Sequence, residues 1–155
     1  MENGLIHVLV SSLAPVLWCR NPTVPLHIFN REVDDAGFDL VLSYTDKLRY
    51  IQVKQLHSHG QNARFPVRLE FTRLPGSCVV LVVHSESTLE VEHYRFLGGS
   101  ARDSMPIVEN EKVSLSTHKR ETHGKRKPRP HYRDIPLRKF SGPLNTRELF
   151  DALFV

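Results

Sequence analysis

The chain has 155 residues, 40% of them hydrophobic, and a formal net charge of +4, which suits a single domain over residues 1–155 with one core. Its apolar runs are far shorter than the ~20 residues of a membrane-spanning helix, and an acidic residue stands where a signal peptide carries positive charge. The two cysteines, Cys19 and Cys78, fall in segments that we expect to be buried. These features argue against a membrane protein and predict a cytoplasmic protein with reduced thiols.

The charge is distributed unevenly. Up to His118 the chain has eleven Lys and Arg against thirteen Asp and Glu, whereas residues 119–139 contain nine basic residues and two acidic ones. Nearly all of the excess positive charge therefore lies in one late segment.

The N-terminal part has the pattern of a helix followed by a strand. Apolar residues recur at helical spacing from Leu5 to Trp18, and Pro15 would kink or shorten this helix. Residues 26–29 are predicted to form a short strand, and residues 34–37 carry a turn signal.

The later elements are less uniform in pattern. Residues 65–74 alternate like a strand but also fit a helix, while residues 77–84 are rich in β-branched residues and are typical of a strand buried on both faces. A further strand is expected at 89–96. Residues 117–133 are polar, basic and interrupted by glycine and proline, so they are predicted to form a flexible arm or long loop. A helix at about 146–154 ends the chain.

The most informative stretch is a predicted hairpin of strands at about 38–44 and 49–56. Gln52 and Lys54 are two residues apart in the second strand, so their side chains project to the same face. Asp39 opens the first strand and can reach the same place. An acid, an amide oxygen and a lysine that converge at a sheet edge make a plausible site for hydrolysis with a divalent metal.

This stretch resembles the PD-(D/E)xK nucleases, the restriction-endonuclease-like superfamily, through residues 37–42 (Gly-Phe-Asp-Leu-Val-Leu) and 51–54 (Ile-Gln-Val-Lys). The resemblance covers about residues 5–97. It implies an α/β fold with the core α-β-β-β-α-β, a central mixed sheet flanked by helices. Because that core has a helix after its third strand, we expect residues 65–74 to be helical.

The resemblance also assigns roles to the three side chains. Asp39 and Gln52 are expected to bind Mg²⁺ or Mn²⁺, although the amide oxygen of Gln52 brings no negative charge. Lys54 is expected to assist water attack, above all by stabilising the charge that develops on the phosphate. The alternative is that Asp39 only ends a turn and bonds a nearby backbone amide, that Gln52 is a solvent-facing residue of an amphipathic strand, and that Lys54 is an ordinary exposed strand lysine.

The first helix departs from the superfamily pattern. His7 stands where many members have a glutamate, and histidine is a poor Mg²⁺ ligand, although Mn²⁺ accepts it better. Substitutes are available in Glu2 and Glu32, and in the acidic pair Asp34 and Asp35. With Gln52 neutral as well, the site is short of negative charge, which argues against an active enzyme.

The basic late segment is expected to bind nucleic acid through phosphate contacts of low sequence specificity. A solvated loop is the common alternative for such a charge run. The expected phosphate-binding side chains are those of Lys119, Arg120, Lys125, Arg126, Lys127, Arg129 and Arg133.

The sequence thus predicts a metal-dependent endonuclease that hydrolyses phosphodiester bonds in DNA, with RNA as the second choice of substrate. The alternative is a catalytically degenerate module of the same fold, which binds nucleic acid or a protein partner without cleaving. No membrane partner is expected. A homodimer is possible, because superfamily members are often dimeric.

Overall fold

The computed structural model describes residues 2–30, 37–60, 63–88, 90–106, 108–120 and 124–155, leaving out the side chains of residues 2, 3, 30 and 117–120. Within these residues the elements, in chain order, are α1 (Glu2–Arg20), β1 (Leu26–Asn30), β2 (Leu40–Tyr44), β3 (Lys47–His57), β4 (Arg64–Arg68), α2 (Leu69–Thr72), β5 (Ser77–His84), β6 (Val91–Gly98), β7 (Lys112–Arg120), β8 (Arg126–Pro136), a 3-10 turn (Leu137–Lys139), β9 (Ser141–Leu144) and α3 (Thr146–Phe154).

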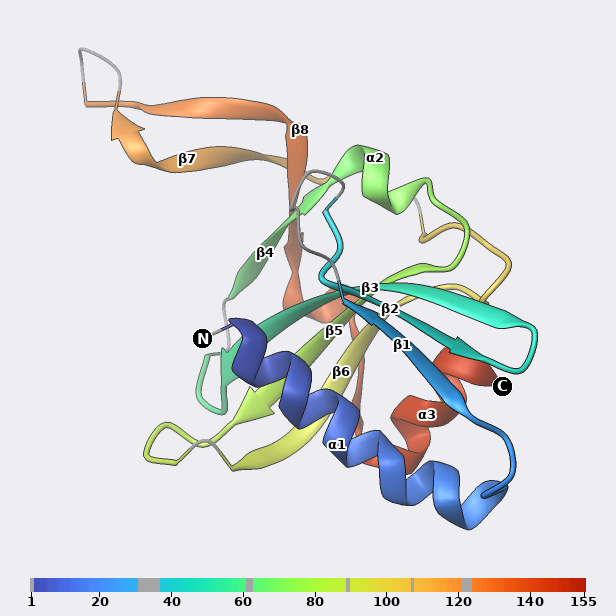
Figure 1. The fold of residues 1–155 in the computed structure, drawn as a ribbon. Helices are drawn as coiled ribbons and strands as arrows, with labels where there is room; N and C mark the ends of the chain where they lie inside the picture. The colour runs from blue at the N-terminus through green and yellow to red at the C-terminus, as the bar shows by residue number, and fades with distance from the viewer. Residues whose placement is uncertain (1, 31–36, 61–62, 89, 107, 121–123) are drawn as a thin grey trace.

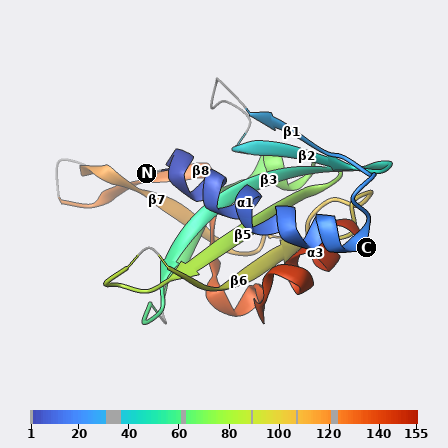
Figure 2. The same cartoon turned by 60° about the horizontal axis from the view of Figure 1, so that its bottom comes forward.

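A central six-stranded sheet has the order β1-β2-β3-β5-β6-β9 (Figures 1 and 2). All neighbouring strands in it are antiparallel except β3 and β5, which run parallel. Every residue of β5 is buried, as the β-branched run predicted for a strand covered on both faces. The predicted α/β class with a mixed central sheet is confirmed.

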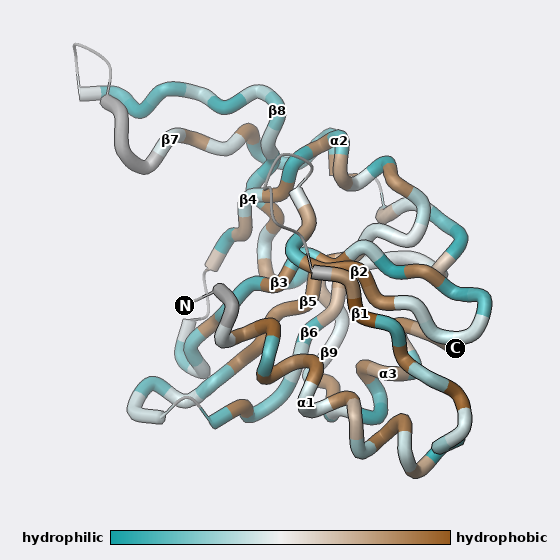
Figure 3. The backbone as a smooth tube through the Cα atoms, viewed as in Figure 1, coloured by the Kyte–Doolittle hydropathy of each residue, from teal (hydrophilic) through white to brown (hydrophobic). Residues whose placement is uncertain are grey.

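A second sheet has the order β4-β8-β7. Its strands β7 and β8 form a hairpin that stands away from the rest of the chain (Figure 1), and the hairpin is largely hydrophilic along its length (Figure 3). The loop expected at 117–133 is therefore wrong for residues 117–120 and 126–133, which are strands, whereas residues 121–123 lie outside the described residues. Cross-strand pairing gives β8 its strand conformation despite Pro128 and Pro130.

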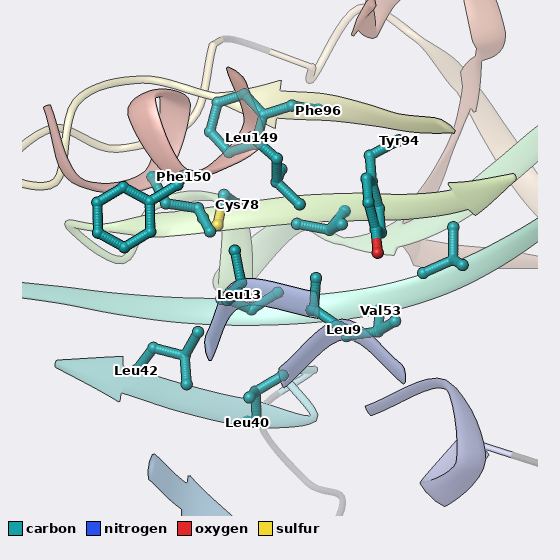
Figure 4. Close-up of a cluster of buried hydrophobic side chains, with 14 of the residues drawn as sticks. Leu9, Leu13, Leu40, Leu42, Val53, Cys78, Tyr94, Phe96, Leu149 and Phe150 are labelled. Carbon is teal, nitrogen blue, oxygen red and sulfur yellow. The ribbon is translucent and has the colours of Figure 1, made fainter. Parts of the chain in front are cut away.

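Helices α1 and α3 cover one face of the central sheet. Leu9 and Leu13 of α1 and Leu149 and Phe150 of α3 pack there against inward side chains of the strands, Leu42 among them (Figure 4). Within the described residues, no helix combines the length and apolar composition that a membrane crossing requires.

The opposite face is covered by β4, α2 and the lower part of β8. Phe65 and Val67 of β4, Phe71 of α2 and Ile135 of β8 are buried there with residues of β5 such as Leu81. The helix expected over 65–74 is therefore wrong for most of its length. Residues 64–68 follow the alternating strand pattern, because β4 pairs with β8 in the register Phe65↔Ile135 and Val67↔Arg133. A single helical turn, α2, follows the strand.

Two further N-terminal expectations are corrected. Helix α1 runs on past Pro15 to Arg20, because Pro15 lies on the exposed side, where water can satisfy the carbonyl of Ser11 that the proline leaves without an N–H partner. Cys19 is exposed, whereas Cys78 is buried as expected.

The C-terminal helix lies at Thr146–Phe154, where a helix was expected, and it begins with a capping box. Asn145 Oδ1 accepts a hydrogen bond from Glu148 N at 2.8 Å, and Glu148 Oε1 accepts one from Asn145 N at 3.3 Å.

The C-terminal end of α3 is held by Arg49, which is only 1% exposed. Its guanidinium donates to the carbonyl oxygens of Leu153 (2.7 Å) and Ala152 (2.9 Å) and to those of residues 99 and 100 (2.7 and 3.1 Å). Arg49 thus ties α3 to the end of β6.

Candidate active site at the β2–β3 edge

The pairing of β2 with β3 ends at Asp39. The two strands are joined by a tight turn in which Thr45 has φ 56°, and they pair from Tyr44↔Lys47 to Leu40↔Ile51. Asp39 N still donates to Ile51 O at 2.8 Å. Beyond this point β3 continues to His57 with β5 as its partner, so among the described residues the edge of β3 that faced β2 has no neighbouring strand.

The carboxylate of Asp39 occupies the first position on that open edge. Its Oδ2 accepts a hydrogen bond from Val53 N at 2.6 Å. Val53 lies between Gln52 and Lys54 in the chain, so the bond places the carboxylate beside the backbone of the Gln-x-Lys motif. The structure thus brings Asp39 to the segment where sequence reasoning expected it.

Gln52 and Lys54 project from β3 to the face opposite α1. Ile51 and Val53 are buried under α1 and α3, whereas Tyr50 and Leu56 belong to the cluster on the other face. Because side chains alternate along a strand, the side chains of residues 52 and 54 share the face of residues 50 and 56. The shared face expected for this pair is present.

The side-chain oxygen of Gln52 has an unusual environment. Gln52 is half-buried, and within the part of the chain that the structure describes its Oε1 is buried and accepts no hydrogen bond. A buried acceptor without a partner costs about 1–3 kcal/mol. Such an oxygen atom is a suitable ligand for a hard cation.

Aromatic side chains form one wall of the site, and sequence reasoning missed them. The rings of Phe38 and Tyr50 meet edge to face with centroids 5.2 Å apart, and Phe38 also lies 6.4 Å from Phe71 of α2. Gly37, at φ 83°, approaches so closely that a Cβ there would lie 3.2 Å from Cβ of Phe71. The signal was available: Phe38 precedes Asp39, and Tyr50 stands two residues before Gln52 on the same face.

The donors at this edge fit a small hard cation that keeps most of its water. Asp39 supplies carboxylate oxygen and Gln52 supplies the unpartnered amide oxygen, and Mg²⁺ is commonly held by one or two carboxylates with water completing the shell. Among the described residues, no three His, Cys, Asp or Glu side chains gather as a metal-binding group.

Of the supplementary ligands considered from the sequence, His7 has a described side chain, and it does not lie at this site. His7 is exposed on α1, which covers the other face of the sheet. Glu32, Asp34 and Asp35 lie outside the described residues, as does the side chain of Glu2.

The predicted phosphate-binding residues lie on the β7–β8 hairpin. Lys125, Arg126 and Lys127 are exposed, and the guanidinium of Arg129 lies 3.8 Å from the ring centre of Tyr132. The side chains of Lys119 and Arg120 are outside the described part, although their backbone belongs to β7.

Arg133 has a different environment from the other cations of the hairpin. Its Nε donates to Glu109 O at 3.2 Å, and its Nη1 donates to Pro130 O at 2.7 Å and to Tyr132 O at 3.1 Å. Arg133 therefore holds the base of the hairpin.

A scan against protein-family models and a search of curated proteins each gave no match to this chain.

Proposed function

We propose that the protein is a metal-dependent nuclease that hydrolyses phosphodiester bonds in DNA. One observation carries the proposal: the Asp39 carboxylate is fixed on Val53 N–H, between Gln52 and Lys54, and Gln52 presents a buried oxygen without a partner among the described residues. An acid, a spare amide oxygen and an amine at one sheet edge are the groups that phosphodiester hydrolysis with a divalent cation needs.

The architecture supports the narrower proposal of a restriction-endonuclease-like core. Helix α1 is followed by the antiparallel strands β1, β2 and β3 and, after β4 and the single turn α2, by β5 parallel to β3. This order agrees with α-β-β-β-α-β, except that β4 is added and the second helix is reduced to four residues.

The chain's own groups have separable roles in this proposal. Asp39 and Gln52 would hold Mg²⁺ or Mn²⁺, which when bound activates water and neutralises phosphate charge. The Val53 N–H fixes the orientation of the carboxylate, so Asp39 is pre-organised as a ligand. Lys54, on the same face as Gln52, places an ammonium where negative charge grows on the phosphate in the transition state.

The cations of the β7–β8 hairpin support a nucleic acid as substrate. Lys125, Arg126 and Lys127 are exposed, adjacent in the chain and on an element that stands away from the body, so phosphates can reach them. DNA is proposed ahead of RNA. The free cysteines of the described chain agree with a reducing compartment, and the cytoplasm is the proposed location.

A second candidate is a nuclease-fold module that binds without cleaving. The observation that favours it is the absence, among the described residues, of three potential metal-binding His, Cys, Asp or Glu side chains in one group. One experiment separates the two candidates.

The experiment is cleavage of supercoiled plasmid and single-stranded DNA by the pure protein with Mg²⁺, Mn²⁺ or EDTA. Asp39→Ala is compared with Asp46→Ala, which removes an exposed carboxylate from the turn of the same hairpin. We expect metal-dependent cleavage that is lost in the first variant and retained in the second. Absence of cleavage by the wild-type protein, or equal cleavage by both variants, would contradict the nuclease and favour the binding module.

A further inference from the structure

Strand β8 changes direction at an elbow. The β7–β8 register runs Val113↔Arg133 and then jumps to Ser114↔Arg129, so residues 130–132 of β8 have no partner in β7. Such a bulge bends the strand, and Figure 1 shows β8 turning there. Arg133 Nη1 donates hydrogen bonds to Pro130 O and Tyr132 O within the bulge. These bonds stabilise the bent conformation of the strand.

Beyond the elbow lies the distal arm, defined as residues 114–120 and 124–129. Between residues 114 and 130 the sequence has six Lys and Arg and a single acidic residue. Residues 124–128 are all exposed. The distal arm is therefore a strongly cationic two-stranded ribbon.

The β8 edge of this ribbon is unsuited to pairing with a protein strand. Pro128 provides no N–H, and a strand added to a sheet edge is held mainly by main-chain hydrogen bonds. Among the described side chains of the distal arm, Leu115 is a large apolar residue with substantial exposure, at 38%. Charge and edge chemistry thus favour a polyanion over a protein partner.

The dimensions of the ribbon select among polyanions. The two strands of such a ribbon lie about 4.8 Å apart. The B-DNA major groove is about 12 Å wide and admits such a ribbon, whereas the minor groove is about 6 Å wide. The major groove of duplex RNA is deep and narrow, and side chains cannot read it. The β7–β8 register shifts again between Leu115 and Arg120, so the length of the ribbon is set by residues 126–129 of β8, about 13 Å at ~3.3 Å per residue, which is comparable with the ~12 Å width of the groove.

We propose that the distal arm enters the major groove of duplex DNA and holds both flanking phosphate backbones. This inference rests on the proposed function, because it names the form of nucleic acid that reaches the site. The base of the arm lies near the candidate site. Tyr132 of β8 pairs with Arg68 at the end of β4. Arg68 in turn lies close to Gly37, two residues before Asp39, because a Cβ on Gly37 would lie 3.4 Å from Cβ of Arg68.

The test measures binding by fluorescence anisotropy in EDTA, so that no cleavage is needed. The probes are a 24-base-pair DNA duplex, one of its strands, and an RNA duplex of the same sequence, over a series of salt concentrations. The arm variant combines Lys125→Gln, Arg126→Gln and Lys127→Gln. The control variant combines Arg102→Gln, Arg138→Gln and Arg147→Gln, three exposed cations outside the hairpin.

We expect the wild-type protein to prefer the DNA duplex. The arm variant should lose about a hundredfold in affinity for it at ~0.15 M salt, with the slope of log K against log salt reduced by about 2.7, because each lost phosphate contact removes roughly 0.9. The control variant should keep the wild-type slope. On the wild-type complex, the major-groove ligand methyl green should displace the protein and the minor-groove ligand netropsin should not.

Three results would overturn the inference. The first is an affinity for the single strand or the RNA duplex that equals the affinity for the DNA duplex and also depends on the arm. The others are displacement of the protein by netropsin but not by methyl green, and a slope of log K against log salt that is the same in the arm variant as in the wild-type protein. Each is independent of catalysis. If Asp39→Ala abolishes cleavage while the arm variant binds DNA normally, the proposed nuclease function is supported and the groove-binding arm is contradicted. If the wild-type protein binds duplex DNA through the arm but never cleaves it, the groove-binding arm is supported and the nuclease function is contradicted.

Discussion

The buried oxygen of Gln52 predicts a conflict between stability and metal binding. Gln52→Met keeps the length and unbranched shape of the side chain and removes the unpartnered acceptor. Since a buried acceptor without a partner costs about 1–3 kcal/mol, and the amide group loses its own contacts, we expect a net gain of about 1–2 kcal/mol without metal. For a chain of this size that gain corresponds to a rise in Tm of roughly 2–8 °C.

The order of stabilities should reverse when metal is added. A ligand at a hundred times its Kd stabilises the folded state by about 2.7 kcal/mol, so the wild-type protein should overtake the variant in saturating Mg²⁺ or Mn²⁺. The variant, left with Asp39 alone, should gain much less.

The assay is thermal unfolding followed by circular dichroism, in EDTA and in a metal series. The control is Glu92→Met, which makes the same kind of change at an exposed polar residue of β6 and should move stability by less than about 0.5 kcal/mol in either buffer. If Gln52→Met is no more stable than wild type in EDTA, the Gln52 oxygen has a partner in solution and the reasoning fails.

Three further predictions follow from single side chains. Lys54→Ala should lower the cleavage rate by about 10²–10³, as expected for a lost electrostatic stabiliser, while DNA affinity in EDTA stays near wild type; a parallel loss of affinity would contradict its assigned role. Arg49→Lys should destabilise the fold by about 2–4 kcal/mol in urea unfolding, because an ammonium cannot replace four guanidinium hydrogen bonds; a change under ~1 kcal/mol would refute the clamp. Burial raises the pKa of the Cys78 thiol to about 12, so at pH 8 that thiol stays protonated and enclosed, and a thiol reagent should modify the exposed Cys19 alone until the protein is denatured. Rapid modification of both cysteines in native protein would show that the core around Cys78 opens.

The hairpin that positions the site was predictable because its signals are local. Alternating apolar residues, a short polar turn and the two-residue spacing of Gln52 and Lys54 fix the strands, their pairing and their shared face. The fully buried strand β5 was predictable for the same reason, since its β-branched run leaves no solvent-facing side.

The errors lie where distant pairing decides the structure. Residues 64–68 form a strand because they pair with residues 132–136, nearly seventy positions later, and nothing within the segment reveals that partner. The prolines and charges of residues 117–133 disfavour strands, so the sequence predicts a flexible arm or long loop there. The strands of the hairpin nevertheless form, because the prolines lie near an open edge of β8 and the charged side chains lie in water.

The candidate site was predictable in its residues but not in its geometry. That Asp39 caps the Val53 N–H, and that Gln52 Oε1 is buried without a partner among the described residues, depends on where β2 leaves β3 and on what covers the sheet. The role of Arg49 as a clamp on α3 was likewise hidden, because an arginine in an alternating strand is ordinarily read as exposed.

The most direct test of the proposed metal centre is a titration of the pure protein with Mn²⁺, followed by the electron paramagnetic resonance of the free ion. The site at the β2–β3 edge predicts one bound Mn²⁺ per chain, lost or weakened at least tenfold in Asp39→Asn and retained in Asp46→Asn. Equal binding by wild type and Asp39→Asn, or no binding by the wild-type protein, would contradict a metal centre at this edge.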